Sequence, residues 1–194
     1  MGIVDYGQTY KALLNSPDEC GDVGLIEFDD ECFLAALIDG LGHGVYARQA
    51  ALLAKEYIHE NISAPLNILI SGMHEHIKGT RGAVAAIIRI DLESGCLLYS
   101  GIGNISAKLL KNEIIKLVPK DGVVGYIMST PVQKEYKISK GEILILHSDG
   151  IKGHFSEDNI RKWKDTPAQQ IAEDILRDYS VTGDDASCIV LKYS

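Results

Sequence analysis

The sequence predicts an α+β fold in which helices cover antiparallel β-sheets. Short apolar runs of strand length recur along the chain, turn residues separate most of them by only a few positions, and three segments switch to helical periodicity. Strands joined by such short turns pair antiparallel, because a parallel crossover needs a dozen or more residues. Sheets and helices that each have one apolar face must cover one another, which favours a layered arrangement over a doubly wound parallel sheet.

The predicted strands follow one another in pairs. We expect four hairpins, formed by residues 25–28 with 32–38, 83–90 with 96–100, 106–110 with 114–118, and 132–138 with 143–147. Residues 186–193 are predicted as a last strand.

Apolar stripes at helical spacing predict helices over residues 46–61, 65–78 and 167–179. The third is expected to begin with Thr166 as its N-cap, Pro167 at the first helical position and Gln169 as a capping-box partner. We interpret all three stripes as core-facing.

Composition limits the possible functions. The 194 residues are 46% hydrophobic and contain no linker or repeat, so we expect a single domain over residues 1–194. A net charge of −8 argues against nucleic acid and membrane surfaces as partners. No apolar run reaches the roughly 20 residues of a membrane span, and no leader pattern is present, so we expect a cytoplasmic protein. Four widely spaced cysteines are expected to be reduced packing residues.

The candidate chemistry lies where two apolar strands run into an Asp-Gly pair. Residues 33–38 lead into Asp39 and Gly40, and residues 143–148 lead into Asp149 and Gly150. An ionised carboxylate at the end of an apolar strand is costly unless a cation or several donors compensate it. The glycine allows an unusual backbone conformation and leaves no Cβ in the way of a carbonyl that turns toward an ion.

Two more acidic positions flank other predicted strands. Asp22 precedes the first strand, and Asp184 and Asp185 precede the last. Asp-Gly is also a common turn dipeptide, and we assign other acidic residues, such as Asp91, to turns. The joint pattern nevertheless favours a metal site, and oxygen ligands without thiolates suit Mg²⁺ or Mn²⁺ better than Zn²⁺.

Other catalytic motifs are missing. The sequence has no phosphate-binding P-loop, no nucleophile elbow and no zinc-protease H-E-x-x-H. Residues 101–104 (GIGN) are interpreted as a tight sheet bend. His43 and His147 each lie within four residues of a candidate aspartate.

The motifs together resemble those of the PPM metal-dependent serine/threonine phosphatases, in the bacterial branch that includes SpoIIE and RsbU. The resemblance rests on DGLGHG at residues 39–44 before a helix, HSDGI at 147–151 after an apolar strand, and GDD at 183–185 before the last strand. With GD at residues 21–22 as the opening motif, it covers nearly the whole chain.

The resemblance implies an αββα sandwich of two antiparallel sheets with two Mn²⁺ or Mg²⁺ ions at one edge. Carried over motif by motif, Asp39 would bridge the ions and Gly40 would offer its carbonyl. Asp22 would serve one ion, while Asp149 and Asp184 would complete the other. We favour Asp184 over Asp185 as the direct ligand because it aligns with the family motif.

Catalysis in this family implies direct attack by metal-activated water on the phosphoester. Asp39 and Asp149 would be essential, and His43 would donate a proton to the leaving oxygen. The sequence departs from larger relatives in two respects. In the first, Gly21 replaces a glutamate and no upstream arginine is present to bind phosphate, so phosphate affinity would depend on the metals. In the second, residues 120–131 form a shorter segment than the usual flap, which implies an open site.

A phosphatase domain that stands alone is nearest to members of the RsbX type. This implies that the substrates are phosphorylated STAS-domain proteins of the stressosome, and we expect the phosphatase itself to be a monomer. Two alternatives stay open: a non-catalytic binding module of the same fold, and a phosphatase that acts on small phosphate esters.

Overall fold

A computed structural model of the protein describes residues 4–13 and 16–194. Within these residues, ten strands form two five-stranded sheets, and every pairing is antiparallel. One sheet has the order β2 (Asp22–Phe28), β3 (Cys32–Gly40), β4 (Ala83–Asp91), β5 (Cys96–Ile102) and β8 (Lys134–Lys137). The other has the order β1 (Val4–Lys11), β10 (Ala186–Tyr193), β9 (Ile143–His147), β6 (Ser106–Leu110) and β7 (Ile114–Leu117).

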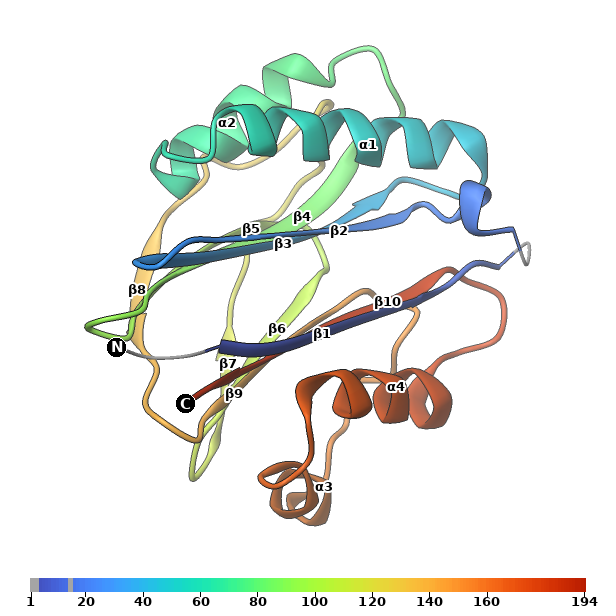
Figure 1. Ribbon diagram of the computed structural model, residues 1–194. Coiled ribbons are helices and arrows are strands. Elements are labelled where there is room, and N and C mark those ends of the chain that lie inside the picture. The colour runs from blue at the N-terminus through green and yellow to red at the C-terminus, as the bar shows by residue number, and fades with distance from the viewer. Residues whose placement is uncertain (1–3, 14–15) are drawn as a thin grey trace.

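Helices cover both outer faces, which gives four layers (Figure 1). The helices α1 (Val45–Glu60) and α2 (Leu66–His76) lie on the β2–β3–β4–β5–β8 sheet, and α3 (Glu157–Trp163) and α4 (Ala168–Tyr179) lie on the other. A short 3₁₀ turn, η1 (Pro17–Glu19), precedes β2. The predicted αββα sandwich is confirmed.

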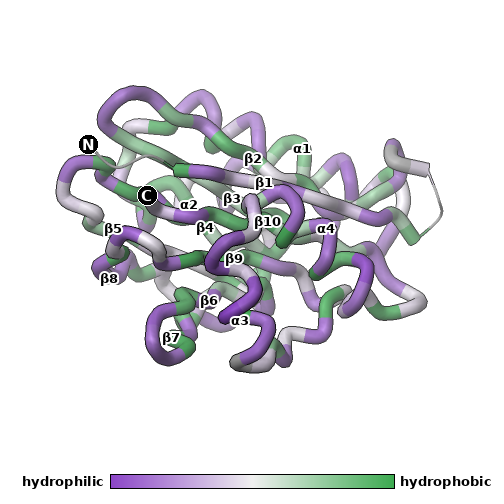
Figure 2. The backbone as a smooth tube through the Cα atoms, turned by 60° about the horizontal axis from the view of Figure 1, so that its bottom comes forward, coloured by the Kyte–Doolittle hydropathy of each residue, from purple (hydrophilic) through white to green (hydrophobic). Residues whose placement is uncertain are grey.

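Strand alternation divides the core into layers. On β3, Phe33, Ala35 and Leu37 face the space between the sheets, whereas Leu34, Ala36 and Ile38 pack toward α1 and α2. A third apolar cluster joins β9 and β10 to α4. Figure 2 shows hydrophilic stretches mostly in the loops and turns at the periphery. Both faces of β3 are therefore buried, so its end is fixed in position.

The fourth predicted hairpin is wrong. Residues 132–138 and 143–147 do not pair: β8 pairs with β5, whereas β9 pairs with β6 and β10. The intervening residues carry the chain from one sheet to the other, with Ile138 N–H bound to the Gly95 carbonyl and Gly141 N–H bound to the Tyr193 carbonyl. The other three hairpins are confirmed.

The helical segments are confirmed, but the predicted cap of α4 is wrong. Pro167 is the N-cap, Thr166 Oγ1 donates to the Lys162 carbonyl, and the Gln169 side chain accepts from the backbone of β1. The role of the cap falls to Asp5, whose Oδ2 accepts the Ala168 N–H at 2.8 Å. Strand β1, which the sequence analysis did not predict, therefore holds the start of α4.

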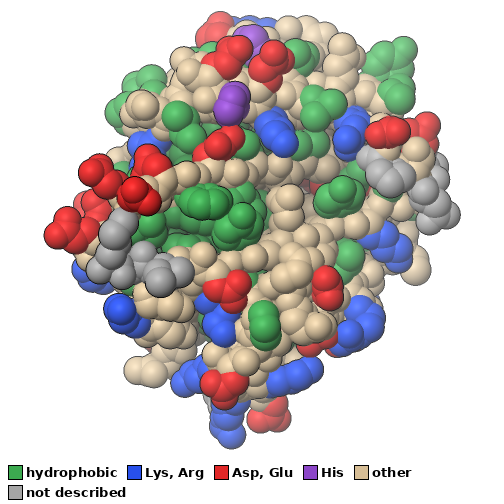
Figure 3. Space-filling view, viewed as in Figure 1, with side chains coloured by type: hydrophobic (Ala, Val, Ile, Leu, Met, Phe, Trp, Pro, Cys, Tyr) green, Lys and Arg blue, Asp and Glu red, His purple; other side chains and the backbone are tan. Residues whose placement is uncertain are grey.

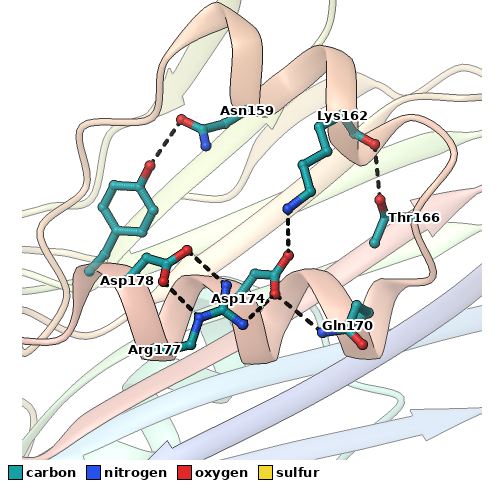
Figure 4. A network of polar contacts seen from close by, with 8 residues as sticks. Asn159, Lys162, Thr166, Gln170, Asp174, Arg177 and Asp178 are labelled. Atoms are coloured by element: carbon teal, nitrogen blue, oxygen red, sulfur yellow. Dashed lines mark hydrogen bonds and ion pairs between the residues drawn. The ribbon is translucent and has the colours of Figure 1, made fainter.

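The short helix α3 was also not predicted, and a polar network attaches it to α4 (Figure 4). Asp174 is buried and accepts from Lys162 on α3 at 3.2 Å and from Arg177 at 2.8 Å. Tyr179 donates its hydroxyl to Asn159 at 2.9 Å. These contacts fix the segment that follows β9.

Hydrophobic side chains gather between the two sheets on the face shown in Figure 3. Tyr6 of β1 contacts the rings of Phe28 and Phe33, with centroids 5.6 and 5.7 Å away. All four cysteines are free thiols, as expected. No helix in the described residues is long and apolar enough to cross a membrane.

Candidate metal centre

Two of the predicted acidic residues meet at one end of the β2–β3 pair. Asp22 begins β2 and stands directly opposite Asp39, next to the last residue of β3. Asp22 is buried, with 4% of its surface exposed, and Asp39 is half-buried. The hairpin turn at the far end sets this register, so the two carboxylates face each other across neighbouring strands.

The other sheet supplies two more carboxylates. Asp149 follows the end of β9 and Asp184 precedes the start of β10, and these two strands are antiparallel neighbours. The end of one and the beginning of the other therefore lie at the same edge. The Ser148 N–H bonds to the Ser187 carbonyl at 3.1 Å, which extends the pairing to this edge. Both carboxylates are exposed.

The carboxylates are close enough to affect one another. Burial, followed by the charges of Asp22 and Asp149, raises the pKa of Asp39 to about 8. Burial also raises the pKa of Asp22 to about 6, although the neighbouring hydroxyls of Ser187 and Ser148 oppose the shift. Asp184 contributes to the shift at Asp39 as well. The predicted residues of both sheets thus form one acidic cluster.

Orphaned buried atoms lie within this cluster. Asp22 Oδ2 and Ser187 Oγ are fully buried and have no hydrogen-bond partner among the described residues. An unpaired buried carboxylate oxygen costs several kcal/mol unless a cation or donor compensates it. Hard divalent cations such as Mg²⁺ and Mn²⁺ bind carboxylate and carbonyl oxygens, so the donor set fits these metals.

The carboxylates of this cluster are spaced more widely than the ligands around a bound metal ion. In the described part of the chain, no three His, Cys, Asp or Glu side chains are gathered as tightly as the ligands of a closed metal site. Like charges on neighbouring carboxylates keep such groups apart. Metal binding here therefore requires the side chains to move toward the cation.

Asp184 and Asp185 have different surroundings. Asp185 is buried, and its carboxylate accepts the backbone N–H groups of Leu13 at 2.7 Å and Gly21 at 2.6 Å. Asp184 accepts the N–H of Asp185 at 2.9 Å and no other hydrogen bond from the described part of the chain, and it stays exposed. Asp185 therefore ties the segment before β2 to β10, which leaves Asp184 as the carboxylate available to a cation.

The glycines of the two Asp-Gly pairs are required for close packing. A Cβ on Gly40 would lie 1.9 Å from the Ala47 carbonyl oxygen of α1, and one on Gly150 would lie 1.9 Å from the Asp185 carbonyl oxygen. Neither glycine has a positive φ, so the expectation of an unusual backbone conformation is wrong. Such conformations occur further along the loop, at Gly42 (φ 85°) and Gly44 (φ 75°).

His43 lies on this loop between β3 and α1 and is exposed. Burial and the charge of Asp149 raise the pKa of Asp184, and the proximity of His43 opposes this rise. His43 is thus near the acidic cluster. His147 differs, because it is buried and its ring nitrogens contact the Ser148 carbonyl and Lys108 Nζ.

Two residues at the cluster were missed as site residues. Asn104 Nδ2 donates to Asp149 Oδ2 at 2.8 Å, from the bend predicted at residues 101–104. Arg81 Nη1 approaches the His43 carbonyl at 3.4 Å, and its guanidinium carbon lies 5.4 Å from the Tyr46 ring centroid. Arg81 therefore supplies a cation at the rim, which the search for an upstream arginine did not find.

Comparison with known proteins agrees with this arrangement. The family described as Stage II sporulation protein E (SpoIIE) matches residues 29–194. The phosphoserine phosphatase RsbX of Bacillus subtilis (strain 168) is 28% identical over 137 residues, which cover 68% of this chain and 67% of RsbX.

Solved structures extend the likeness to the fold. A chain from a structure of the bacterial stressosome has a TM-score of 0.90 and 27% identity, and the match covers 98% of this chain and 100% of that one. RsbX in complex with magnesium has a TM-score of 0.82 and 23% identity, with 100% and 96% covered. The PP2C phosphatase domain of SpoIIE from Bacillus subtilis has a TM-score of 0.80 and 19% identity, with 100% and 64% covered.

Proposed function

The chain belongs to the SpoIIE family, and from this premise we propose that it is a protein phosphatase that hydrolyses phosphoserine and phosphothreonine with the help of Mn²⁺ or Mg²⁺. The likeness to the phosphoserine phosphatase RsbX supports this reaction, and the magnesium complex of RsbX supports the type of metal. The observation that carries the proposal is the facing pair Asp22 and Asp39 with its orphaned Asp22 Oδ2, next to the two exposed carboxylates, Asp149 and Asp184, that the other sheet adds.

The proposed ligands of two cations are the carboxylates of Asp22, Asp39, Asp149 and Asp184 and the Gly40 carbonyl. When bound, the cations supply an activated water for attack on phosphorus and neutralise charge on the phosphoryl oxygens. The chain itself orients these ligands: β2 and β3 hold Asp22 opposite Asp39, and Asn104 fixes one oxygen of Asp149.

Residues at the rim handle the substrate. We assign to His43 the donation of a proton to the departing serine or threonine oxygen, because it is exposed on the loop beside Asp184. Arg81 binds the phosphoryl group from the same side, since its guanidinium is exposed and held near the His43 carbonyl.

The proposed substrates are phosphorylated STAS-domain proteins of the stressosome. The likeness to RsbX and to the stressosome chain supports this choice. We further propose a cytoplasmic monomer in which one phosphatase domain spans residues 1–194; the four free thiols agree with a reducing compartment.

The test is hydrolysis of an aryl phosphate by metal-stripped protein, with Mn²⁺, Mg²⁺ or Ca²⁺ added back and the Asp39→Asn variant as control. We expect Mn²⁺ or Mg²⁺ to restore turnover in the wild type only. No restoration by any metal, together with no manganese binding by calorimetry, would contradict the proposal and favour a binding module.

Substrate class needs a second comparison. A phosphorylated STAS-domain protein, a phosphopeptide and a sugar phosphate are compared by kcat/KM. We expect the folded phosphoprotein to give the highest value. A preference for the sugar phosphate would favour a phosphatase of small esters.

A further inference from the structure

A second site, which contains basic side chains, lies next to the acidic cluster on the outer face of the β1–β10–β9–β6–β7 sheet. It is a cavity of about 620 Å³, and its walls include Lys108 on β6, Lys116 on β7, His147 on β9 and the segment 153–156 before α3. From His147 the chain reaches Asp149 in two residues. Ser106, also in the wall, is two residues from Asn104, which holds Asp149. The cavity therefore borders the proposed metal centre.

Lys108 is a cation inside this wall. Only 5% of the residue is exposed, and its Nζ contacts the Gly153 carbonyl, His147 Nε2 at 3.2 Å and the Phe155 ring, whose centroid is 4.6 Å away. The His147 Nδ1 lies 2.9 Å from the Ser148 carbonyl, so Nδ1 carries the proton and Nε2 accepts from Lys108. Each of these partners is neutral, so none balances the ammonium charge.

No described side chain supplies a negative charge next to the ammonium group of Lys108 or Lys116. None of them places a carboxylate oxygen within 4.0 Å of either Lys108 Nζ or Lys116 Nζ. Lys116 stands directly opposite Lys108 in the β6–β7 register, and like charges in that position destabilise a sheet. Burial, then Lys116, lowers the pKa of Lys108 to about 8, so the group remains mostly charged at pH 7.

We propose that this cavity is an anion-binding subsite, in which Lys108 and Lys116 bind a phosphate or carboxylate group beside the metal centre. A buried cation opposite a second cation, in a protein of net charge −8, is stabilised by an anion placed between them and the solvent. The anion is either a second acidic group on the substrate or the released phosphate; the first of these rests on the proposed function.

Binding is tested without turnover, so the result is independent of the phosphatase assignment. Inorganic sulfate is titrated into metal-free protein and followed by ¹H–¹⁵N NMR. We expect saturable shifts of the backbone signals of Lys108, Lys116 and residues 153–156. Lys116→Met, which changes an exposed side chain and leaves the buried one in place, should weaken the affinity at least threefold, and Lys108→Met at least tenfold.

The matched control is Lys78→Met, which removes one exposed positive charge from the far side of the sandwich and should leave the sulfate affinity unchanged. Circular dichroism of each variant checks that it is folded. Equal affinities in wild type, Lys116→Met and a folded Lys108→Met would overturn the subsite, as would shifts confined to residues outside the cavity.

Two further arms distinguish the sources of the anion. If the substrate supplies it, a phosphopeptide with a glutamate near the phosphoserine has a lower KM than its glutamine counterpart, and Lys116→Met removes the difference. If the product supplies it, Lys116→Met weakens inhibition by inorganic phosphate and leaves the two peptides in the same KM ratio. A variant that changes neither quantity and still binds sulfate like the wild type contradicts the proposal.

Discussion

Asp22 and Asp39 stand directly opposite each other on β2 and β3, two carboxylates in a cross-strand position that opposite charges or apolar side chains usually occupy. Burial raises the pKa of Asp22 to about 6, and burial together with the charge of Asp22 raises the pKa of Asp39 to about 8. The cost of this pair depends on whether a cation lies between the two sheets.

The acidic pair makes the stability of the metal-free protein depend on pH. Because the pKa of Asp39 is higher in the folded state than its usual value near 4, its contribution to the free energy of unfolding is fully present below about pH 4 and is lost as the pH rises through about 8. Asp39→Asn should therefore raise Tm at pH 8 by about 3 °C or more and change it little at pH 4. Calorimetry in the presence of a chelator measures this, with Asp30→Asn in an exposed turn as control. Equal shifts at both pH values would contradict the explanation.

Asp39 and Asp149 come from different sheets, and we expect each to be essential for turnover. Asp39→Asn and Asp149→Asn should each reduce kcat on an aryl phosphate by at least about 100-fold, because each removes a charged ligand of the proposed cations. Far-ultraviolet circular dichroism should remain unchanged. Asp30→Asn serves again as the matched control, and metal-dependent activity in both site variants would refute the ligand assignment.

Asn104 acts through Asp149, and its removal should weaken metal binding. Without the 2.8 Å bond to Asp149 Oδ2, the carboxylate loses its orientation. Asn104→Ala should lower Mn²⁺ affinity by about 10-fold to 100-fold, as measured by isothermal titration calorimetry. Asn112→Ala, in the exposed β6–β7 turn, should bind like the wild type. Identical affinities of the two variants would show that Asn104 has no positioning role.

The sequence was informative where a local pattern carries the chemistry. The apolar strands that lead into Asp39 and Asp149 can be recognised from a few consecutive residues. Three hairpins can likewise be predicted from the short turns that join their strands. Asn104 and Arg81 could not be found in this way, because their contacts join residues 45 and 38 positions apart.

The missed elements have a similar explanation. Strand β1 is a largely polar edge strand with the sequence VDYGQTYK, so it lacks an apolar stripe. The β8–β9 hairpin failed because a short connection between two strands does not reveal that they belong to different sheets. The pairing of neighbouring strands in a hairpin is thus more predictable than the assignment of a strand to a sheet.

Gly40 should not tolerate a side chain. Its added Cβ would lie 1.9 Å from the Ala47 carbonyl oxygen, so Gly40→Ala should lower the free energy of unfolding by about 2 kcal/mol or more. Gly21→Ala is the comparison, because its nearest neighbours are 3.2–3.3 Å away and can adjust. Urea denaturation measures both variants. A larger loss in Gly21→Ala would reverse the interpretation of the two sites.

Arg81 should affect substrate binding more than chemistry. Arg81→Ala should raise KM for a phosphopeptide severalfold with a smaller change in kcat, and Arg81→Lys should recover part of the affinity. Steady-state kinetics at saturating Mn²⁺ separate the two constants. Lys140→Ala removes the same charge from an exposed turn and should leave both constants unchanged. A fall in kcat alone would assign Arg81 to the chemical step instead.

The pairing of β1 with β10 also joins the first described strand of the chain to the last, so synthesis separates the two partners in time. The β2–β3–β4–β5–β8 sheet is complete once residue 137 has emerged, but β1 must wait for β10, at residues 186–193, before its sheet can close. Asp22 and Asp39 are therefore synthesised well before Asp184. The proposed cation site therefore has its full set of carboxylates only when the last strand has been made and has joined the first.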